Sequence, residues 1–254
     1  MSVVEAAPAA PAKKPPRVWK FWGTLAWGLM IFAAMCVGQI GLVAYFVLSR
    51  GGALDPASLI TLVGNGRTIA LSVLAGLPGV LAASWLAIRF TRISFADYLA
   101  LRGFFWKWLL IGIVALAVLS QGWDWVAHTV GHEVAPGFMS EVLKSARADN
   151  SLWILVLSFC VAAPLTEEFM TRGFLYRGWS ESFLRPLGAI VLSTLVWTCM
   201  HLQYDAFFLG QVFSIGLLFG YLRYRSNSTW LTVILHGLNN LAATLQTIYL
   251  LGGS

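Results

Sequence analysis

Long apolar runs separated by short polar connections occupy most of the chain after residue 20. A helix needs about 20 mostly apolar residues to cross the hydrocarbon of a bilayer. Seven runs approach or exceed this length, and the fifth and sixth are joined by a tight turn at residues 203–205. We therefore predict an all-α, polytopic transmembrane helix bundle of about seven spans, with these ranges: 21–48, 68–90, 107–127, 154–178, 187–204, 206–223 and 228–250.

Two segments lack the apolar pattern. Residues 1–20 are rich in Ala and Pro, which predicts a disordered tail in front of a transmembrane domain over 21–254. The first apolar run, 21–48, is too long for the hydrophobic region of a cleaved signal peptide, so we expect it to be retained as an anchor. Residues 131–150 are polar and contain a short amphipathic stretch near 137–147, which predicts an external loop beside the membrane surface.

The composition supports a membrane protein. Hydrophobic residues make up 58% of the chain and charged residues 11%, whereas soluble domains have about 25% charged residues. The mean hydropathy is +0.74. The net charge of +6 could indicate a nucleic-acid partner, but the basic residues are dispersed over the ends of apolar runs. We therefore expect membrane lipids, and not nucleic acid, as the surroundings of this chain.

The basic residues also predict an orientation. With the N-terminus inside, only four of the 17 Lys and Arg residues fall on the outer side, namely Arg50, Arg67, Lys144 and Arg147. The excess on the inner side agrees with the positive-inside rule. We expect an integral protein of a bacterial inner (plasma) membrane with a cytoplasmic N-terminus.

Polar residues that are costly at membrane depth gather in three of the predicted spans. Counted from the inner ends at 1.5 Å per residue, they lie at similar depths of roughly 15–22 Å. The fourth span carries Glu167, Glu168 and Arg172, the fifth carries His201, and the seventh carries His236 and Asn240.

The spacing of these residues assigns them to helix faces. Glu168 and Arg172 are four residues apart and can pair on one face, so that Arg172 neutralises Glu168. Glu167 lies about 100° around the helix and can face a different neighbour. His236 and Asn240 share a face of the seventh span. Such a cluster can also serve only to hold helices together, but three helices with polar groups at one level favour a functional site in a polar cavity inside the membrane.

Three motifs in order on successive apolar helices resemble those of the CAAX-protease and bacteriocin-processing (CPBP, or Abi) family of intramembrane proteases, which includes CAAX prenyl protease 2. The resemblance covers about residues 152–245, which would be the catalytic core. The EExxxR, FxxxH and HxxxN motifs correspond to Glu167-Glu168-Phe-Met-Thr-Arg172, Trp197-Thr-Cys-Met-His201 and His236-Gly-Leu-Asn-Asn240, with Trp197 in place of the phenylalanine.

The resemblance implies an endopeptidase that uses a glutamate-activated water. By position, Glu167 would be the general base and His201 would help to hold and polarise the water. His236 and Asn240 would donate hydrogen bonds to the tetrahedral oxyanion. The substrate would be a membrane-associated protein or peptide, and we expect water to reach the site from the inner side, where the basic residues lie.

Two alternatives stay open. Glu167, His201 and His236 could form a His₂Glu zinc site with an open position for water, although the mechanism without a cofactor is our preference because an amide such as Asn240 suits an oxyanion donor better than a zinc ligand. The polar cluster could also belong to a non-catalytic membrane protein, such as an immunity factor, a scaffold or a proton-coupled carrier.

Overall fold

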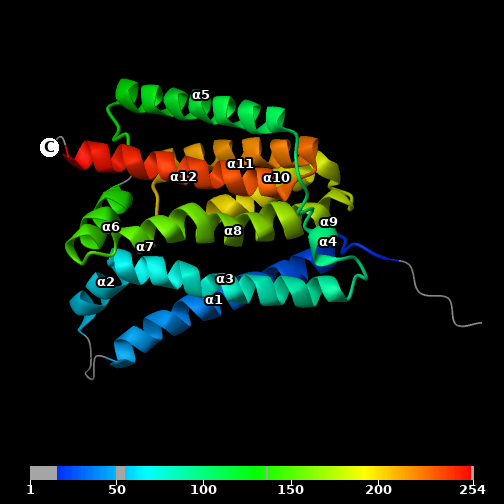
Figure 1. Cartoon of the computed structure of the whole chain (residues 1–254), viewed down its shortest axis with the longest axis horizontal. Coiled ribbons are helices and arrows are strands. Elements are labelled where there is room, and N and C mark those ends of the chain that lie inside the picture. The colour runs from blue at the N-terminus through cyan, green and yellow to red at the C-terminus, as the bar shows by residue number, and fades with distance from the viewer. Residues whose placement is uncertain (1–15, 50–54, 136, 253–254) are drawn as a thin grey trace, which may run out of the picture.

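The computed structural model describes residues 16–49, 55–135 and 137–252, and within these ranges every regular element is a helix (Figure 1). Residues 1–15 of the predicted tail lie outside the described residues. The prediction of an all-α membrane helix bundle is confirmed. In chain order the elements are α1 (Phe21–Ser49), α2 (Pro56–Gly64), α3 (Gly66–Arg89), α4 (Phe95–Tyr98), α5 (Trp106–Val130), α6 (Gly137–Ala148), α7 (Leu152–Leu157), η1 (Ser158–Ala162), α8 (Ala163–Glu168), η2 (Phe169–Leu175), α9 (Tyr176–Ser180), α10 (Arg185–Cys199), α11 (Ala206–Ser226) and α12 (Thr229–Gly252).

The seven predicted spans correspond in order to helical segments. Five segments are long and apolar enough to cross a membrane: α1, α3, α5, α11 and the continuous segment from Leu152 to Ser180 that comprises α7 to α9. α12 has 24 residues but is not among these five. Polar side chains along it, including His236, Asn240 and Gln246, lower its hydropathy.

The fifth predicted span is shorter than expected. α10 has 15 residues, or about 22 Å at 1.5 Å per residue, which is less than the roughly 30 Å of a hydrocarbon core. The predicted range 187–204 is wrong at its end, because the helix stops at Cys199. The Asp205 carboxylate then accepts hydrogen bonds from the first backbone N–H groups of α11 and caps that helix. His201 consequently lies in the turn between the two helices and not within a span.

The helices form a bundle with α1 and α3 along one side and α5 along the opposite side (Figure 1). α1 and α3 approach closely where glycine leaves room: a Cβ atom at Gly38 would lie 2.2 Å from the carbonyl oxygen of Ala75. Small residues permit this kind of backbone contact between membrane helices. Exposed apolar side chains, such as Val37 on α1 and Val118 on α5, cover the outside of the bundle.

The segment from Leu152 to Ser180 runs through the middle of the bundle. Every residue from Glu168 to Tyr176 is buried. Phe174 and Trp179 of this segment belong to an apolar cluster with residues of α1, α3 and α10. The acidic residues of the predicted site therefore lie on the most enclosed helix of the bundle, where neighbouring helices can reach them from several sides.

Candidate active site

The acidic pair lies on a helix with an irregular hydrogen-bond register. η1 and η2 are π-helical, and they flank α8, which ends with Glu167 and Glu168. π-helical turns are rare in proteins and frequently occur at functional sites. With this register, Glu167 contacts α10, Arg172 contacts α11 and Glu168 contacts α12.

Pro164 accounts for part of this irregularity. It has no N–H group to donate to the carbonyl oxygen of Cys160, four residues earlier in the chain. On α12, Gly237 lies against that carbonyl group, because a Cβ atom at position 237 would be 2.5 Å from the Cys160 oxygen. The close approach of α12 brings the neighbouring residue, His236, against the acidic pair.

Glu168 and Arg172 form the predicted ion pair. The Arg172 Nη1 atom lies 2.9 Å from Glu168 Oε1, and both side chains are fully buried. Arg172 also donates a hydrogen bond from Nη2 to the carbonyl oxygen of Gly216 on α11, at 3.1 Å, and its guanidinium group lies 4.6 Å from the ring centroid of Trp197 on α10. Glu168 is thus neutralised, and Arg172 connects the central segment to two other helices.

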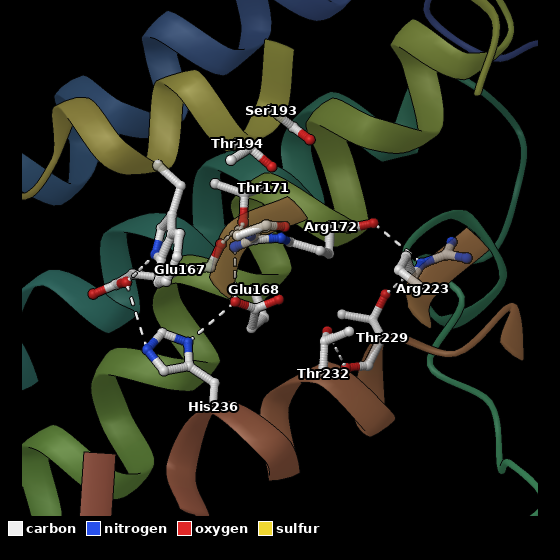
Figure 2. A network of polar contacts seen from close by, with 12 residues as sticks. Glu167, Glu168, Thr171, Arg172, Ser193, Thr194, Arg223, Thr229, Thr232 and His236 are labelled. Carbon is white, nitrogen blue, oxygen red and sulfur yellow. Dashed lines mark hydrogen bonds and ion pairs between the residues drawn. The ribbon is translucent and has the colours of Figure 1, made fainter. Parts of the chain in front are cut away.

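His236 lies between the two glutamates (Figure 2). Its Nδ1 atom is 3.1 Å from Glu168 Oε1, and its Nε2 atom is 3.9 Å from Glu167 Oε2. A carboxylate beside Nδ1 favours the tautomer with the proton on that nitrogen. The imidazole is only 2% exposed. His236 is therefore a buried residue that contacts both carboxylates.

Glu167 faces away from the ion pair, as its position on the helix predicts. Its Oε2 atom accepts a hydrogen bond from Trp197 Nε1 at 2.5 Å, and its side chain retains 16% exposure. Trp197 occupies the position where the family motif has phenylalanine, a residue without a donor. The indole N–H group is a feature of the site that the motif alone does not predict, although tryptophan is the aromatic side chain that carries an N–H donor.

The other two candidate residues also contact the backbone of the site. His201 Nδ1 lies 2.9 Å from the carbonyl oxygen of Trp197. Because a carbonyl group can only accept, Nδ1 carries the proton of a neutral His201 and Nε2 is left as an acceptor. Asn240 donates from Nδ2 to the carbonyl oxygen of Phe159 at 2.8 Å, in π-helical η1. The second N–H of this amide is available to another acceptor.

Glu167, His201 and Asn240 line one cavity of about 1040 Å³. The cavity extends from Glu167 to Val134 and Tyr204, which lie in the connections at the end of the bundle that holds α6 and the turn between α10 and α11. The cavity thus extends from Glu167 away from the end of the bundle where most basic residues lie, which differs from the expectation that water arrives from that end.

Sequence reasoning missed much of the cavity wall. Carboxamide side chains contribute to it from four helices and one turn, and a signal for them is present in the sequence, because polar residues that interrupt apolar runs are candidates for functional sites. They are Gln39, Gln121, Gln203, Gln211, Asn239 and Gln246.

The three candidate zinc ligands, Glu167, His201 and His236, make other contacts in this structure. Among the residues that the structure describes, no three His, Cys, Asp or Glu side chains are grouped so that they could hold a metal ion. The ring of Trp197 contacts both imidazoles, with centroids 5.0 Å from His201 and 5.3 Å from His236. The N–H group of Trp197 donates a hydrogen bond to Glu167 Oε2, and His236 Nδ1 is hydrogen-bonded to Glu168 Oε1. The arrangement suits hydrogen-bond chemistry of a carboxylate better than metal coordination.

A comparison with models of protein families gave a match that includes the site. Residues 149–242 match the family model described as type II CAAX prenyl endopeptidase Rce1-like. All residues of the three motifs lie within this range. Comparisons with curated proteins and with solved structures gave no match. The segment 149–242 is thus similar to the Rce1-like type II CAAX prenyl endopeptidases.

Proposed function

We propose that this chain is an intramembrane endopeptidase that hydrolyses a peptide bond of a membrane-associated protein or peptide with water activated by Glu167 and His201. The family is one of endopeptidases, which supports the reaction class. The observation that carries the proposal is the difference between the two adjacent glutamates. Glu168 is fully buried and paired with Arg172, whereas Glu167 lines the cavity. Two carboxylates in contrasting environments are typical of a division between a supporting and a reactive group.

The proposed reaction begins with a water molecule held in the cavity between Glu167 and Nε2 of His201. Glu167 accepts a proton from this water as its oxygen attacks the carbonyl carbon of the peptide bond. The negative charge moves to the carbonyl oxygen, where the free N–H of Asn240 donates a hydrogen bond. Protonated Glu167 then gives its proton to the leaving nitrogen, the C–N bond breaks, and a carboxyl group and an amine are released.

His236 and Trp197 position the reactive carboxylate in this scheme. His236 contacts Glu167 and Glu168 together, so it couples the reactive group to the rigid ion pair. The Trp197 N–H group holds one oxygen of Glu167 and leaves the other toward the cavity. We retain an inner-membrane location with a cytoplasmic N-terminus, which the distribution of basic residues supports.

The test is hydrolysis of a panel of fluorogenic peptides by the purified protein in lipid vesicles. Glu167→Gln keeps the size of the side chain but removes the base, and we expect the rate to fall by about 10²–10⁴-fold. Glu181→Gln is the matched control, because Glu181 is a half-exposed residue that pairs with Arg177 at the surface. Retention of the wild-type rate by Glu167→Gln contradicts the proposal.

A further inference from the structure

We propose that Arg223 is a positioning residue for the acidic pair, because its guanidinium group binds a carbonyl oxygen that the π-helical register of η2 releases at Arg172. Arg223 lies on α11 and outside the three motifs of the site. Its effect on the reaction rate rests on the proposed hydrolysis, whereas its effect on the helix register can be measured without any reaction. The hydrogen bonds at the two π-helical segments, the burial of Arg223 and the contacts of α11 support this role.

The first π-helical segment, η1, has a carbonyl group that the helix itself cannot pair. In an α-helix each backbone N–H group donates to the carbonyl oxygen four residues earlier, but the N–H group of Ala163 donates to Ser158, five residues earlier. The carbonyl group of Phe159 therefore loses its α-helical donor, and its donor in a continued π register would be Pro164, which has no N–H group. Asn240 supplies the missing donor from α12 at 2.8 Å. A motif residue thus completes the hydrogen bonds of this segment.

The second π-helical segment, η2, repeats this arrangement on the other side of the acidic pair. The N–H group of Tyr176 donates to Thr171, five residues earlier, and the α register resumes with α9, which begins at Tyr176. The carbonyl group of Arg172 thus loses its α-helical donor. Arg223 Nε lies 3.2 Å from this carbonyl oxygen and donates to it (Figure 2). Buried carbonyl groups are nearly always paired in proteins, so Arg223 does for η2 what Asn240 does for η1.

Arg223 is buried although the acceptors of its hydrogen bonds carry no charge. The residue is 2% exposed. Its Nε–H group is shared between the Arg172 carbonyl and the Thr229 hydroxyl, which is 3.0 Å away, and Nη1 donates to the side-chain oxygen of Asn227 at 3.1 Å. The guanidinium group also lies 5.2 Å from the ring centroid of Tyr176. Arginine is rarely buried unless it is paired, and burial of a charge against neutral groups is costly. Arg223 is therefore better explained by its contact with the backbone of η2 than by a gain in stability.

The helix α11 holds Arg172 at two points. The Arg172 side chain donates from Nη2 to the carbonyl oxygen of Gly216, and the Arg172 backbone accepts from Arg223. Gly216 and Arg223 are seven residues apart on α11, which is about two turns and places them on one face. One helix therefore fixes both the side chain that neutralises Glu168 and the backbone from which that side chain extends.

Loss of the Arg223 donor would favour the α register, in which Tyr176 donates to Arg172 and the released carbonyl group is paired again. A change of one residue in register turns the two parts of a helix by about 100° relative to each other. Because α9 is packed in the apolar cluster with residues of α1 and α3, the turn would move the acidic pair. Glu167 would then lose its hydrogen bond with Trp197.

Two substitutions of Arg223 separate the donor from the charge. Glutamine has an N–H group at the position of the arginine Nε atom, because both nitrogen atoms are bonded to Cδ, whereas methionine has a methyl group at the corresponding position. Arg223→Gln and Arg223→Met both remove the positive charge, so the donor distinguishes them. Arg225→Gln and Arg225→Met are matched controls, because Arg225 is exposed on the same helix and donates to the hydroxyl of Tyr221. Arg223→Leu replaces Arg223→Met if the latter does not fold.

We expect Arg223→Gln to keep kcat within about threefold of the wild-type value, and Arg223→Met to lower kcat at least about tenfold with KM within about twofold. Both Arg225 variants should keep the wild-type rate. Equal kcat values for Arg223→Gln and Arg223→Met overturn the proposed role, whether the values are high or low, because the donor then makes no difference.

Amide hydrogen exchange tests the register without catalysis. Peptides that cover residues 169–176 are compared by mass spectrometry between the purified wild type and the two Arg223 variants. We expect exchange in this segment to be at least about tenfold faster in Arg223→Met and within about threefold of wild type in Arg223→Gln, because a segment that turns out of its packing opens more readily. Equal exchange in the two variants contradicts the role of the donor. If exchange differs between them but the wild type hydrolyses no peptide, the role in the register stands and the proposed hydrolysis fails.

Discussion

The two halves of the central helical segment differ in the surroundings of their charged side chains. Toward the basic end, the central segment buries Glu168 and Arg172 completely and pairs them with each other. Toward the other end, Glu167 lines a cavity of about 1040 Å³ whose wall includes several carboxamide side chains. Two adjacent residues of one helix thus differ: Glu168 belongs to a buried, neutralised ion pair that anchors the helix, whereas Glu167 is the proposed reactive carboxylate. The Glu168–Arg172 pair fixes the position of the helix. The cavity gives Glu167 access to water and, in the proposed reaction, to the substrate.

The largest effect on stability should come from replacing a member of the Glu168–Arg172 ion pair. Arg172→Met leaves the Glu168 carboxylate buried without its partner, and loss of one member of a buried ion pair costs about 3–5 kcal/mol. We expect the free energy of unfolding in detergent to fall by this amount. Lys144→Met, at an exposed ion pair with Glu141, is the control and should change it by less than about 1 kcal/mol. An unchanged stability of Arg172→Met means that the pair does not anchor the helix.

Trp197 lies between the two regions, so its replacement sharpens the comparison. Trp197→Phe restores the residue of the family motif and keeps an aromatic ring beside Arg172, but it removes the donor to Glu167. A hydrogen bond to a charged group contributes about 1.5–3 kcal/mol, so we expect kcat to fall by about 10- to 150-fold with little change in KM or in thermal stability.

Trp197→Ala removes the ring as well and should lower the melting temperature in addition to the rate. If Trp197→Phe loses as much stability as Trp197→Ala, the indole N–H supports the fold of the bundle and does not specifically position Glu167.

The smallest expected effect is that of a zinc chelator. The contacts of Glu167 and His236 are to Trp197 and Glu168, and the proposed mechanism uses no metal. We therefore expect the hydrolysis rate after treatment with a chelator and dialysis to stay within about twofold of the untreated rate. A loss of activity that added zinc restores would revive the His₂Glu alternative.

The sequence predicts the helical segments well because apolar runs of sufficient length have few alternatives in lipid. It also predicts the Glu168–Arg172 pair and the different direction of Glu167, since both follow from positions along a helix. Other features depend on neighbours. The π-helical register around the acidic pair reflects Pro164 and the packing of α12, and the end of α10 before His201 depends on the turn into α11.

The direction of the cavity could not be derived from the motifs. It depends on α1 and α5, which carry none of them, and on the connections after α5 and α10. The hydrogen bond from Trp197 to Glu167 likewise requires α10 and α8 to pack with these two residues side by side. Sequence spacing specifies the face of one helix, whereas the contact between two helices depends on all the side chains that pack between them.

The most direct test of the account compares Glu167→Gln with Glu168→Gln in both hydrolysis and unfolding. We predict that Glu167→Gln loses at least about 100-fold in rate and keeps its stability to within about 1 kcal/mol, because its side chain is partly exposed. Glu168→Gln should lose about 3–5 kcal/mol of stability, because Arg172 is then buried without a counter-charge. Equal loss of stability in the two variants, or hydrolysis at the wild-type rate by Glu167→Gln, would contradict the division between anchor and reactive group.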